Sequence, residues 1–285
     1  MNIPFADAHL HINSVKGVKA SYVAAKFKEV GGWFLAPVSG SPWDYDIDLS
    51  PDVTAAYLKV VEHHTAECRE LAEHGLKVAC IAGFYPGDVD RLAAVLSPAT
   101  ILEVGYKVID YVAELCRKGL LDGIGEVGRQ HYRTTPERVV VSELIMERAL
   151  LAANDNRCVV HLHLEDIGRD TVTLTNEVIK VLGLKPSPKI VFHHARTDMI
   201  PEAARLGYSA TLFGRPELLE AAFSRLEPNF MVESDFPGMD SERVISPWSI
   251  AANEKRVAER LGLGPEYLYK LNVDNVVRTY GVTPP

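Results

Sequence analysis

Cysteine is scarce in this 285-residue chain, and its four cysteines form no recognisable motif. They stand at positions 68, 80, 116 and 158, with no C-x-x-C pair among them. This spacing predicts neither a zinc site built from thiolates nor a redox-active dithiol. Three of the four lie within apolar patterns typical of small buried side chains, so we expect a reduced, cytoplasmic protein.

Long apolar runs are also absent, since no stretch reaches the roughly 18 uninterrupted apolar residues of a membrane helix. The first residues carry neither a basic nor a long apolar segment, so we expect no signal peptide and no membrane partner. Basic residues are outnumbered, with 30 Lys and Arg against 38 Asp and Glu and a formal net charge of −8. This balance argues against a general nucleic-acid coat protein.

No linker, low-complexity tract or block of like charge divides the chain, so we expect one domain over residues 1–285. What recurs is a short apolar run, rich in β-forming residues, followed by a helical stretch. Runs that are apolar along their whole length are typical of strands covered on both faces. The eight runs cover residues 3–8, 33–38, 78–84, 123–127, 158–162, 190–193, 209–213 and 230–232.

Helical patterns lie between these runs. Ser50-Pro51 predicts the start of a helix that ends at Gly75, and Thr135-Pro136 predicts the start of a second. Further helices are predicted at residues 106–118, 170–182, 216–226, 242–261 and 266–280, with Asp170 and Ser241 as caps. Strand and helix alternate about eight times, which predicts an α/β protein with a single (β/α)8 TIM barrel.

Histidine is the residue type that stands out, because six of the ten histidines lie in pairs at the ends of predicted strands. Residues i and i+2 of a strand point to the same side, so two such histidines can reach one point. Two carboxylates, Glu126 and Asp235, end two other runs. The three pairs are His9 and His11, His161 and His163, and His193 and His194.

The carboxyl ends of the strands in a (β/α)8 barrel converge on one mouth, where active sites are built. We therefore expect these histidines and carboxylates to meet there. Imidazoles with carboxylates suit a divalent metal ion, and six candidate ligands are more than one ion needs. We expect one or two ions of zinc, manganese, magnesium, cobalt or iron, which activate a bound water for hydrolysis.

Five short motifs, in this order along the chain, resemble those of the TatD-like branch of the amidohydrolase superfamily, a group of metal-dependent hydrolases. They are D-x-H-x-H at residues 7–11, G-E-x-G at 125–128, strand-end histidines at 161 and at 194 or 193, and S-D-x-P at 234–237. Each motif alone is weak, whereas five in register over most of the chain form a specific pattern.

The resemblance implies a barrel that holds two metal ions. Carried over by position, the ligands of one ion are His9, His11 and Asp235, and those of the other are His161 and His194, with Glu126 bridging. Asp235 would also orient or deprotonate the attacking water. Members closest to the family name are deoxyribonucleases that cleave phosphodiesters, and the wider superfamily hydrolyses amides, lactones and phosphotriesters.

The chain departs from the nuclease pattern in two places. His163 stands where those nucleases have an arginine, and Ala195-Arg196 follows the sixth-strand histidine instead of Cys-Phe or a similar pair. The candidate rim segment 43–48 is acidic, so both DNA and a small molecule stay open as substrates. The side chains expected to support the ligands or to contact substrate are His131, His163, His193 and Arg196.

These observations predict a divalent-metal-dependent hydrolase that acts on phosphodiesters of the nucleic-acid type, with Glu126 and Asp235 as catalytic groups. The alternatives are hydrolysis of an amide, lactone or ester, and a non-catalytic metal-binding barrel. The sequence leaves the choice between His193 and His194 open, and it indicates no oligomeric state.

Overall fold

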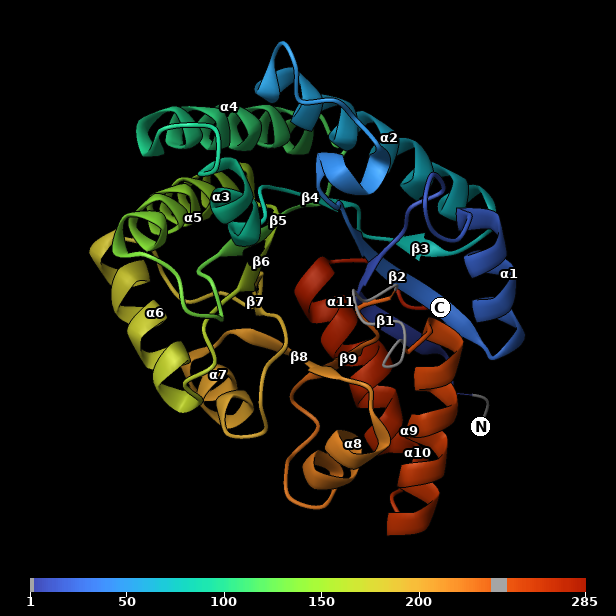
Figure 1. The fold of residues 1–285 in the computed structure, drawn as a ribbon. Coiled ribbons are helices and arrows are strands. Elements are labelled where there is room, and N and C mark those ends of the chain that lie inside the picture. The colour runs from blue at the N-terminus through green and yellow to red at the C-terminus, as the bar shows by residue number, and fades with distance from the viewer. Residues whose placement is uncertain (1–2, 237–244) are drawn as a thin grey trace.

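The computed structural model describes residues 3–236 and 245–285, which form a barrel of parallel strands enclosed by helices (Figure 1). The strands follow one another in the order β1-β2-β4-β5-β6-β7-β8-β9, and β3 pairs with β2, so β3 and β4 share one position in the barrel. The predicted (β/α)8 barrel is therefore confirmed. The strands are β1 (Phe5–His11), β2 (Gly32–Val38), β3 (Lys77–Val78), β4 (Ile81–Ala82), β5 (Gly123–Gly128), β6 (Val159–His163), β7 (Ile190–Phe192), β8 (Ser209–Phe213) and β9 (Met231–Glu233).

The first and last strands are joined by residues of the first and last motifs. Ser234, directly after β9, donates from its backbone N–H to Oδ1 of Asp7 over 3.0 Å and from its hydroxyl to Oδ2 over 2.5 Å. The backbone N–H of Asp235 donates to the carbonyl oxygen of His9 over 3.0 Å. These bonds close the barrel and bring Asp235 beside the histidines of β1.

Helices cover the outside of the barrel, and the C-terminal helical segment lies across one end of its interior (Figure 1). There Val273 and Val276 pack against small inward-facing residues of β1, Ala6 and Ala8. The helical segments are α1 (Ala20–Glu29), η1 (Pro42–Tyr45), α2 (Val53–Glu73), α3 (Pro86–Leu92), α4 (Pro98–Arg117), α5 (Pro136–Asn156), α6 (Arg169–Val181), α7 (Met199–Leu206), α8 (Pro216–Phe223), α9 (Pro247–Leu261), α10 (Pro265–Tyr269), η2 (Lys270–Asp274) and α11 (Asn275–Tyr280).

The eight predicted runs coincide with the strand positions of the barrel, but some helix starts are wrong. The helix predicted from Ser50-Pro51 begins at Val53, because Asp52 is the residue that caps it. The side chain of Asp52 accepts a hydrogen bond from the backbone N–H of Ala55 over 3.2 Å, which satisfies one of the free N–H groups of the first turn. The helix predicted from residue 106 begins two turns earlier, at Pro98.

The predicted cap at Asp170 is also wrong, since α6 follows Gly168. The predicted cap at Ser241 lies outside the described residues, and α9 begins after Ser246, whose side chain accepts from the N–H of Ser249. Helices α1, α3 and α7, which span ten, seven and eight residues, are missing from the prediction. Over residues 3–236 and 245–285, no helix is both long and apolar enough to cross a membrane.

The expectation that the cysteines stay reduced is wrong for Cys68 and Cys80, which form a disulfide. Cys68 lies near the end of α2, and Cys80 lies between β3 and β4. The chain turns back at Gly75, so residues 12 positions apart meet across the interface between α2 and the barrel. No cysteine motif signals this contact, because the tertiary packing of α2 creates it. Cys116 and Cys158 remain free.

We expect Glu254 of α9 to contribute a decline in the stability of the fold as the pH rises, because its carboxyl is buried. Its Oε2 accepts from the side-chain amide of Asn272 over 2.6 Å, while Oε1 has no hydrogen-bond partner among the described residues. Burial raises the pKa of Glu254 to about 8 from an ordinary value of 4.5. The folded state therefore keeps a proton that the unfolded state loses between these two values, and stability declines by up to about 1.4 kcal/mol per pH unit in that window.

Urea unfolding followed at several pH values between about 5 and about 8 measures this decline. In Glu254→Gln the part of the slope due to Glu254 disappears, since the amide does not titrate. Glu259→Gln, an exposed change on the same helix, is the control and keeps the wild-type slope. Equal slopes of stability against pH in the two variants contradict the assignment of this pH dependence to Glu254.

Candidate metal centre

The residues singled out from the sequence come together at the carboxyl ends of the strands. Glu126 of β5, only 5% exposed, lies at the centre of the cluster. Its Oε1 lies 2.8 Å from Nε2 of His9, 3.2 Å from Nε2 of His11 and 3.5 Å from Nε2 of His193. Its Oε2 lies 3.2 Å from Nδ1 of His163. A single carboxylate thus contacts imidazoles from three other strand positions.

Asp235, directly after β9, is the second carboxylate of the cluster. Its Oδ1 lies 3.3 Å from Nε2 of His11 and 3.9 Å from Nε2 of His9. Its Oδ2 lies 3.2 Å from Nε2 of His194. Asp235 is 22% exposed and His194 is 37% exposed, so this side of the cluster faces the open mouth.

The hydrogen bonds beneath the cluster fix which nitrogen of His9 carries the proton. The hydroxyl of Tyr280 donates to the carbonyl oxygen of Ala8 over 2.9 Å, so it accepts from Nε2–H of His161, also over 2.9 Å. Nδ1 of His161 therefore has a lone pair and accepts from Nδ1–H of His9 over 2.9 Å. The lone pair of a neutral His9 is then on Nε2, which points at Glu126.

The other rings are oriented in the same way. Nδ1–H of His11 donates to the carbonyl oxygen of Val38 over 2.9 Å. A buried carboxylate, Glu233, accepts from Nδ1–H of both His193 and His194 over 2.9 and 2.7 Å. All three rings therefore turn Nε2 toward the cluster. Burial opposes protonation of His11 and His194, but the neighbouring carboxylates raise the pKa of both rings well above the ordinary value, so without a cation these two Nε2 atoms keep a proton, whereas Nε2 of His193 is bare. Sequence reasoning missed Glu233, the last residue of β9, because the S-D-x-P motif begins one residue later, at Ser234.

This arrangement fits a divalent cation. Lone pairs of His9 and His193 face Oε1 of Glu126 over 2.8 and 3.5 Å, and two acceptors at this separation repel unless a proton or a metal ion lies between them. Nδ1 of His163 and Nε2 of His193 are buried without a hydrogen-bond partner in the described part of the chain. Nitrogen and carboxylate oxygen donors are those that zinc, manganese, cobalt and iron accept in proteins.

Charges within the cluster keep the ligand atoms in the forms that bind a cation. Burial opposes ionisation of Glu126, but its contacts with the surrounding imidazoles, among them protonated His11, hold the pKa of its carboxyl well below the usual range. Burial likewise opposes ionisation of Asp235, and His194 and His11 hold its pKa far below normal. Burial lowers the pKa of His193 to about 3, so this ring stays neutral at physiological pH.

The two histidines of β6 lie at different depths. His163, nearer the mouth, contacts Glu126, whereas His161 lies below it and has both ring nitrogens engaged, one by His9 and one by Tyr280. His161 is therefore within the cluster, but it turns no free nitrogen toward either carboxylate. His193 and His194 both reach the mouth, where His193 contacts Glu126 and His194 contacts Asp235.

The predicted substrate-contacting residues do not all line the mouth. His131 reaches it indirectly, through a 2.6 Å hydrogen bond between its Nδ1 and Nε2 of His163. Arg196 is more than half exposed and pairs with Asp166 and Asp198, away from the residues that border the cavity. We find no cavity contact for the Arg196 side chain among the described residues.

A cavity of about 260 Å3 opens above the cluster. Glu126, His163, His194 and Asp235 line its floor, and two cationic side chains border it, Lys16 from the loop after β1 and Arg91 from α3. Sequence reasoning missed both, because one lies in a loop and the other in a short helix without a clear period. Lys16 is paired with Asp46. The guanidinium of Arg91 lies over the ring of Trp43 at 5.2 Å and 3.5 Å from Asp88.

Backbone geometry is unusual at the mouth. His194 and Asp235 have φ angles of 54° and 51°, in the left-handed region that residues other than glycine rarely adopt. Gly128, the last glycine of G-E-x-G, has a φ of 147°, and a Cβ there would overlap the carbonyl oxygen of His163. This glycine is therefore required for β5 and β6 to approach closely and place Glu126 beside His163.

A parallel (β/α)8 barrel with histidines and carboxylates gathered at its mouth is the architecture of barrel-type metal-dependent hydrolases. The chain belongs to the TatD related DNase family, whose model matches residues 6–281.

Individual relatives are distant. The uncharacterized protein MJ1127 of Methanocaldococcus jannaschii is 23% identical over 286 residues, which cover 98% of this chain and 96% of the relative. The crystal structure of YJJV, a TatD homologue from Escherichia coli, superposes with a TM-score of 0.66 at 15% identity, covering 99% of this chain and 100% of that one. The phosphotriesterase homology protein of Escherichia coli, crystallised with phosphate in its active site, gives a TM-score of 0.61 at 13% identity over 98% and 99% of the two chains. These structural likenesses show the shared fold.

We expect Glu233→Gln to lower the affinity for a divalent ion by about 10–100-fold. The amide loses the negative charge that holds His193 and His194 with Nδ1 protonated and Nε2 turned toward the cluster. Competition of Zn2+ between the protein and a chelator measures the affinity. Glu227→Gln, an exposed change before the same strand, is the control. Wild-type affinity in Glu233→Gln contradicts the orienting role.

Proposed function

We propose that this protein is a divalent-metal-dependent hydrolase whose active site is the cluster at the barrel mouth. The observation that carries the proposal is the set of buried imidazole nitrogens of His9, His163 and His193 aimed at Glu126. Structural packing alone does not account for this set, because buried acceptors that face one another are destabilising without a cation. Family membership supports the same chemistry.

The ligand assignment follows the directions of the nitrogens. His9, His11 and Asp235 would hold one ion, and Glu126 would bridge to a second, as the motifs predict. For the second ion we propose His163 and His193 in place of His161 and His194. The two proposed rings have a buried nitrogen without a partner that points at Glu126, whereas both nitrogens of His161 are engaged. A divalent ion in this site lowers the pKa of a water molecule and polarises the bond under attack.

Asp235 is the proposed general base. It is an ionised carboxylate at the open side of the cluster, where an attacking water can approach from the cavity. Its Oδ2 is 3.2 Å from Nε2 of His194, which provides a path for the proton toward solvent because His194 is the more exposed of the two.

The cavity favours a small anionic substrate. Its volume of about 260 Å3 suits a small molecule or the end of a strand more than a duplex, and Lys16 and Arg91 border it. The guanidinium of Arg91 lies over the ring of Trp43, and a guanidinium suits an anionic oxygen pair. We therefore propose a phosphodiester as the first substrate class, with amides, lactones and esters as the second.

The test is to purify the protein, measure its bound metals, and assay nitrophenyl phosphodiesters, short DNA, lactones and amides with added Mn2+ or Zn2+. Hydrolysis that requires the metal supports the proposal, and the preferred compound identifies the substrate class. Tight metal binding with no turnover across the whole panel favours a non-catalytic metal-binding barrel instead.

A further inference from the structure

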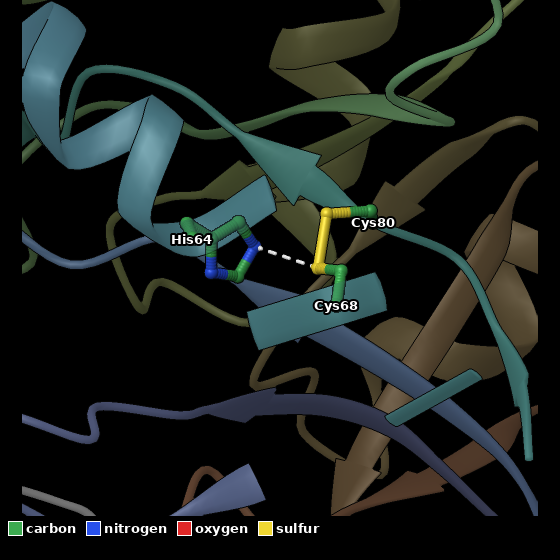
Figure 2. A group of neighbouring side chains, drawn as sticks. All are labelled: His64, Cys68 and Cys80. Atoms are coloured by element: carbon green, nitrogen blue, oxygen red, sulfur yellow. Dashed lines mark hydrogen bonds between the residues drawn. A yellow bond between two sulfur atoms is a disulfide. The ribbon is translucent and has the colours of Figure 1, made fainter. Parts of the chain in front are cut away.

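A second cluster of metal-binding side chains lies away from the mouth, between α2 and the barrel wall. Figure 2 shows His64 and Cys68 of α2 together with Cys80, which lies between β3 and β4. His64 and Cys68 are four residues apart, so they share one face of the helix. All three are buried, with exposed fractions of 0%, 4% and 4%, and none of them lines the mouth cavity.

The donor atoms already lie close together. One donor atom from each residue lies within 4.8 Å of the other two, and Nε2 of His64 lies 3.5 Å from Sγ of Cys68. Zinc bonds of about 2.0–2.1 Å to nitrogen and about 2.3 Å to sulfur, at a tetrahedral angle, place the two donors about 3.6 Å apart. The spacing between His64 and Cys68 is therefore that of two ligands of one ion.

The imidazole of His64 is incompletely satisfied. Its Nε2 lies 3.2 Å from the carbonyl oxygen of Pro37, which can only accept, so Nε2 carries the proton there. Nδ1 is buried with no hydrogen-bond partner among the described residues. The neutral ring can bind a metal through Nε2 after its proton moves to Nδ1.

We propose that His64, Cys68 and Cys80 form a second metal site, which takes a thiophilic divalent cation such as Zn2+ once the disulfide is reduced. A dithiol reductant supplies two electrons and two protons, which break the S–S bond and form two thiols, while the reductant becomes a disulfide. Each thiol then loses its proton as its sulfur bonds to the cation, so two protons are released for each ion bound.

The site links the same two elements in both redox states. The disulfide joins α2 to the segment before β4 in the oxidised protein, and the cation joins them in the reduced protein. The chemistry also differs from that of the mouth, where the described donors are imidazole and carboxylate without sulfur.

Cobalt distinguishes the two sites, because thiolate ligation of Co2+ produces intense sulfur-to-metal charge-transfer absorption in the near ultraviolet. The full chain is reduced anaerobically with dithiothreitol, freed of reductant and titrated with Co2+. We expect this absorption to appear in the reduced protein only, to saturate when one ion per chain is bound by thiolate beside the ions held at the mouth, and to disappear when Zn2+ displaces the cobalt. Absence of the band in reduced wild-type protein overturns the proposal, whatever the mouth binds.

Variants assign the ligands. Cys68→Ser and Cys80→Ser remove the band, whereas Cys116→Ser, a change in one of the free cysteines, keeps it. His64→Gln leaves both thiols and weakens Co2+ binding at least about tenfold, since loss of a supporting partner alone costs that much. Loss of the band in Cys116→Ser, or unchanged affinity in His64→Gln, overturns the three-residue assignment. If a cysteine variant does not fold, the comparison of reduced and oxidised wild-type protein still shows whether thiolates bind the ion.

Discussion

Asp235→Asn is expected to lower kcat/KM for the preferred substrate by about 10²–10⁴-fold, the usual contribution of a general base. The carboxylate of Asp235 lies between Nε2 of His11 and Nε2 of His194, which hold its pKa far below normal once burial is offset. Asparagine keeps the shape of the side chain but cannot take a proton from water. Activity measured at saturating Mn2+ or Zn2+, together with the bound metal, separates loss of the base from loss of a ligand.

Asp198→Asn is the matched control, because Asp198 is an exposed aspartate that pairs with Arg196 on the surface. It should retain wild-type kcat/KM. Full metal-dependent activity in Asp235→Asn would show that another group takes the proton, and the role proposed for Asp235 would then be wrong.

Glu126→Gln is expected to have the larger effect, a loss of at least about 10³-fold in kcat/KM together with a lower metal content. Both oxygens of Glu126 contact imidazoles, and the rings of His9, His11 and His163 all lie beside its negative charge. Glutamine removes this charge and replaces one acceptor with an N–H2 donor. Elemental analysis of the purified variant, with the activity assay beside it, measures both losses.

Glu137→Gln, which changes an exposed glutamate in the first turn of α5, is the control and should alter neither kcat/KM nor the metal content. Circular dichroism of both variants checks that the barrel is intact. A folded Glu126→Gln protein that keeps its full metal content contradicts the bridging role, even if its activity falls.

Much of the site could be predicted from the sequence because parallel strands of a barrel end at one mouth. Glu126 and Asp235 stand more than a hundred residues apart, yet both follow or end apolar runs, and this position alone places them together. The pairing of Asp7 with Ser234 has the same origin, since the first and last strands of a closed barrel are neighbours. The order of the strands and the position of each residue at a strand end were therefore enough to predict that these side chains lie together.

The roles within a histidine pair could not be predicted in this way. Alternation places His161 and His163 on the same side of β6, but two residues along a strand also differ by about 6–7 Å in depth. The deeper ring meets His9 and Tyr280, and the shallower ring meets Glu126. In β1 the register shifts between Asp7 and Leu10, and both His9 and His11 reach the same carboxylate oxygen.

The sequence by itself determined the barrel, the order of its strands and the chemical types gathered at its mouth, because these depend on apolar periodicity and on which residues end the strands. Only the tertiary structure decided which nitrogen faces which oxygen, that Glu233 orients two rings, and that Cys68 meets Cys80. These contacts depend on depth along a strand and on how α2 packs against the wall. Neither quantity leaves a periodic signal in the chain.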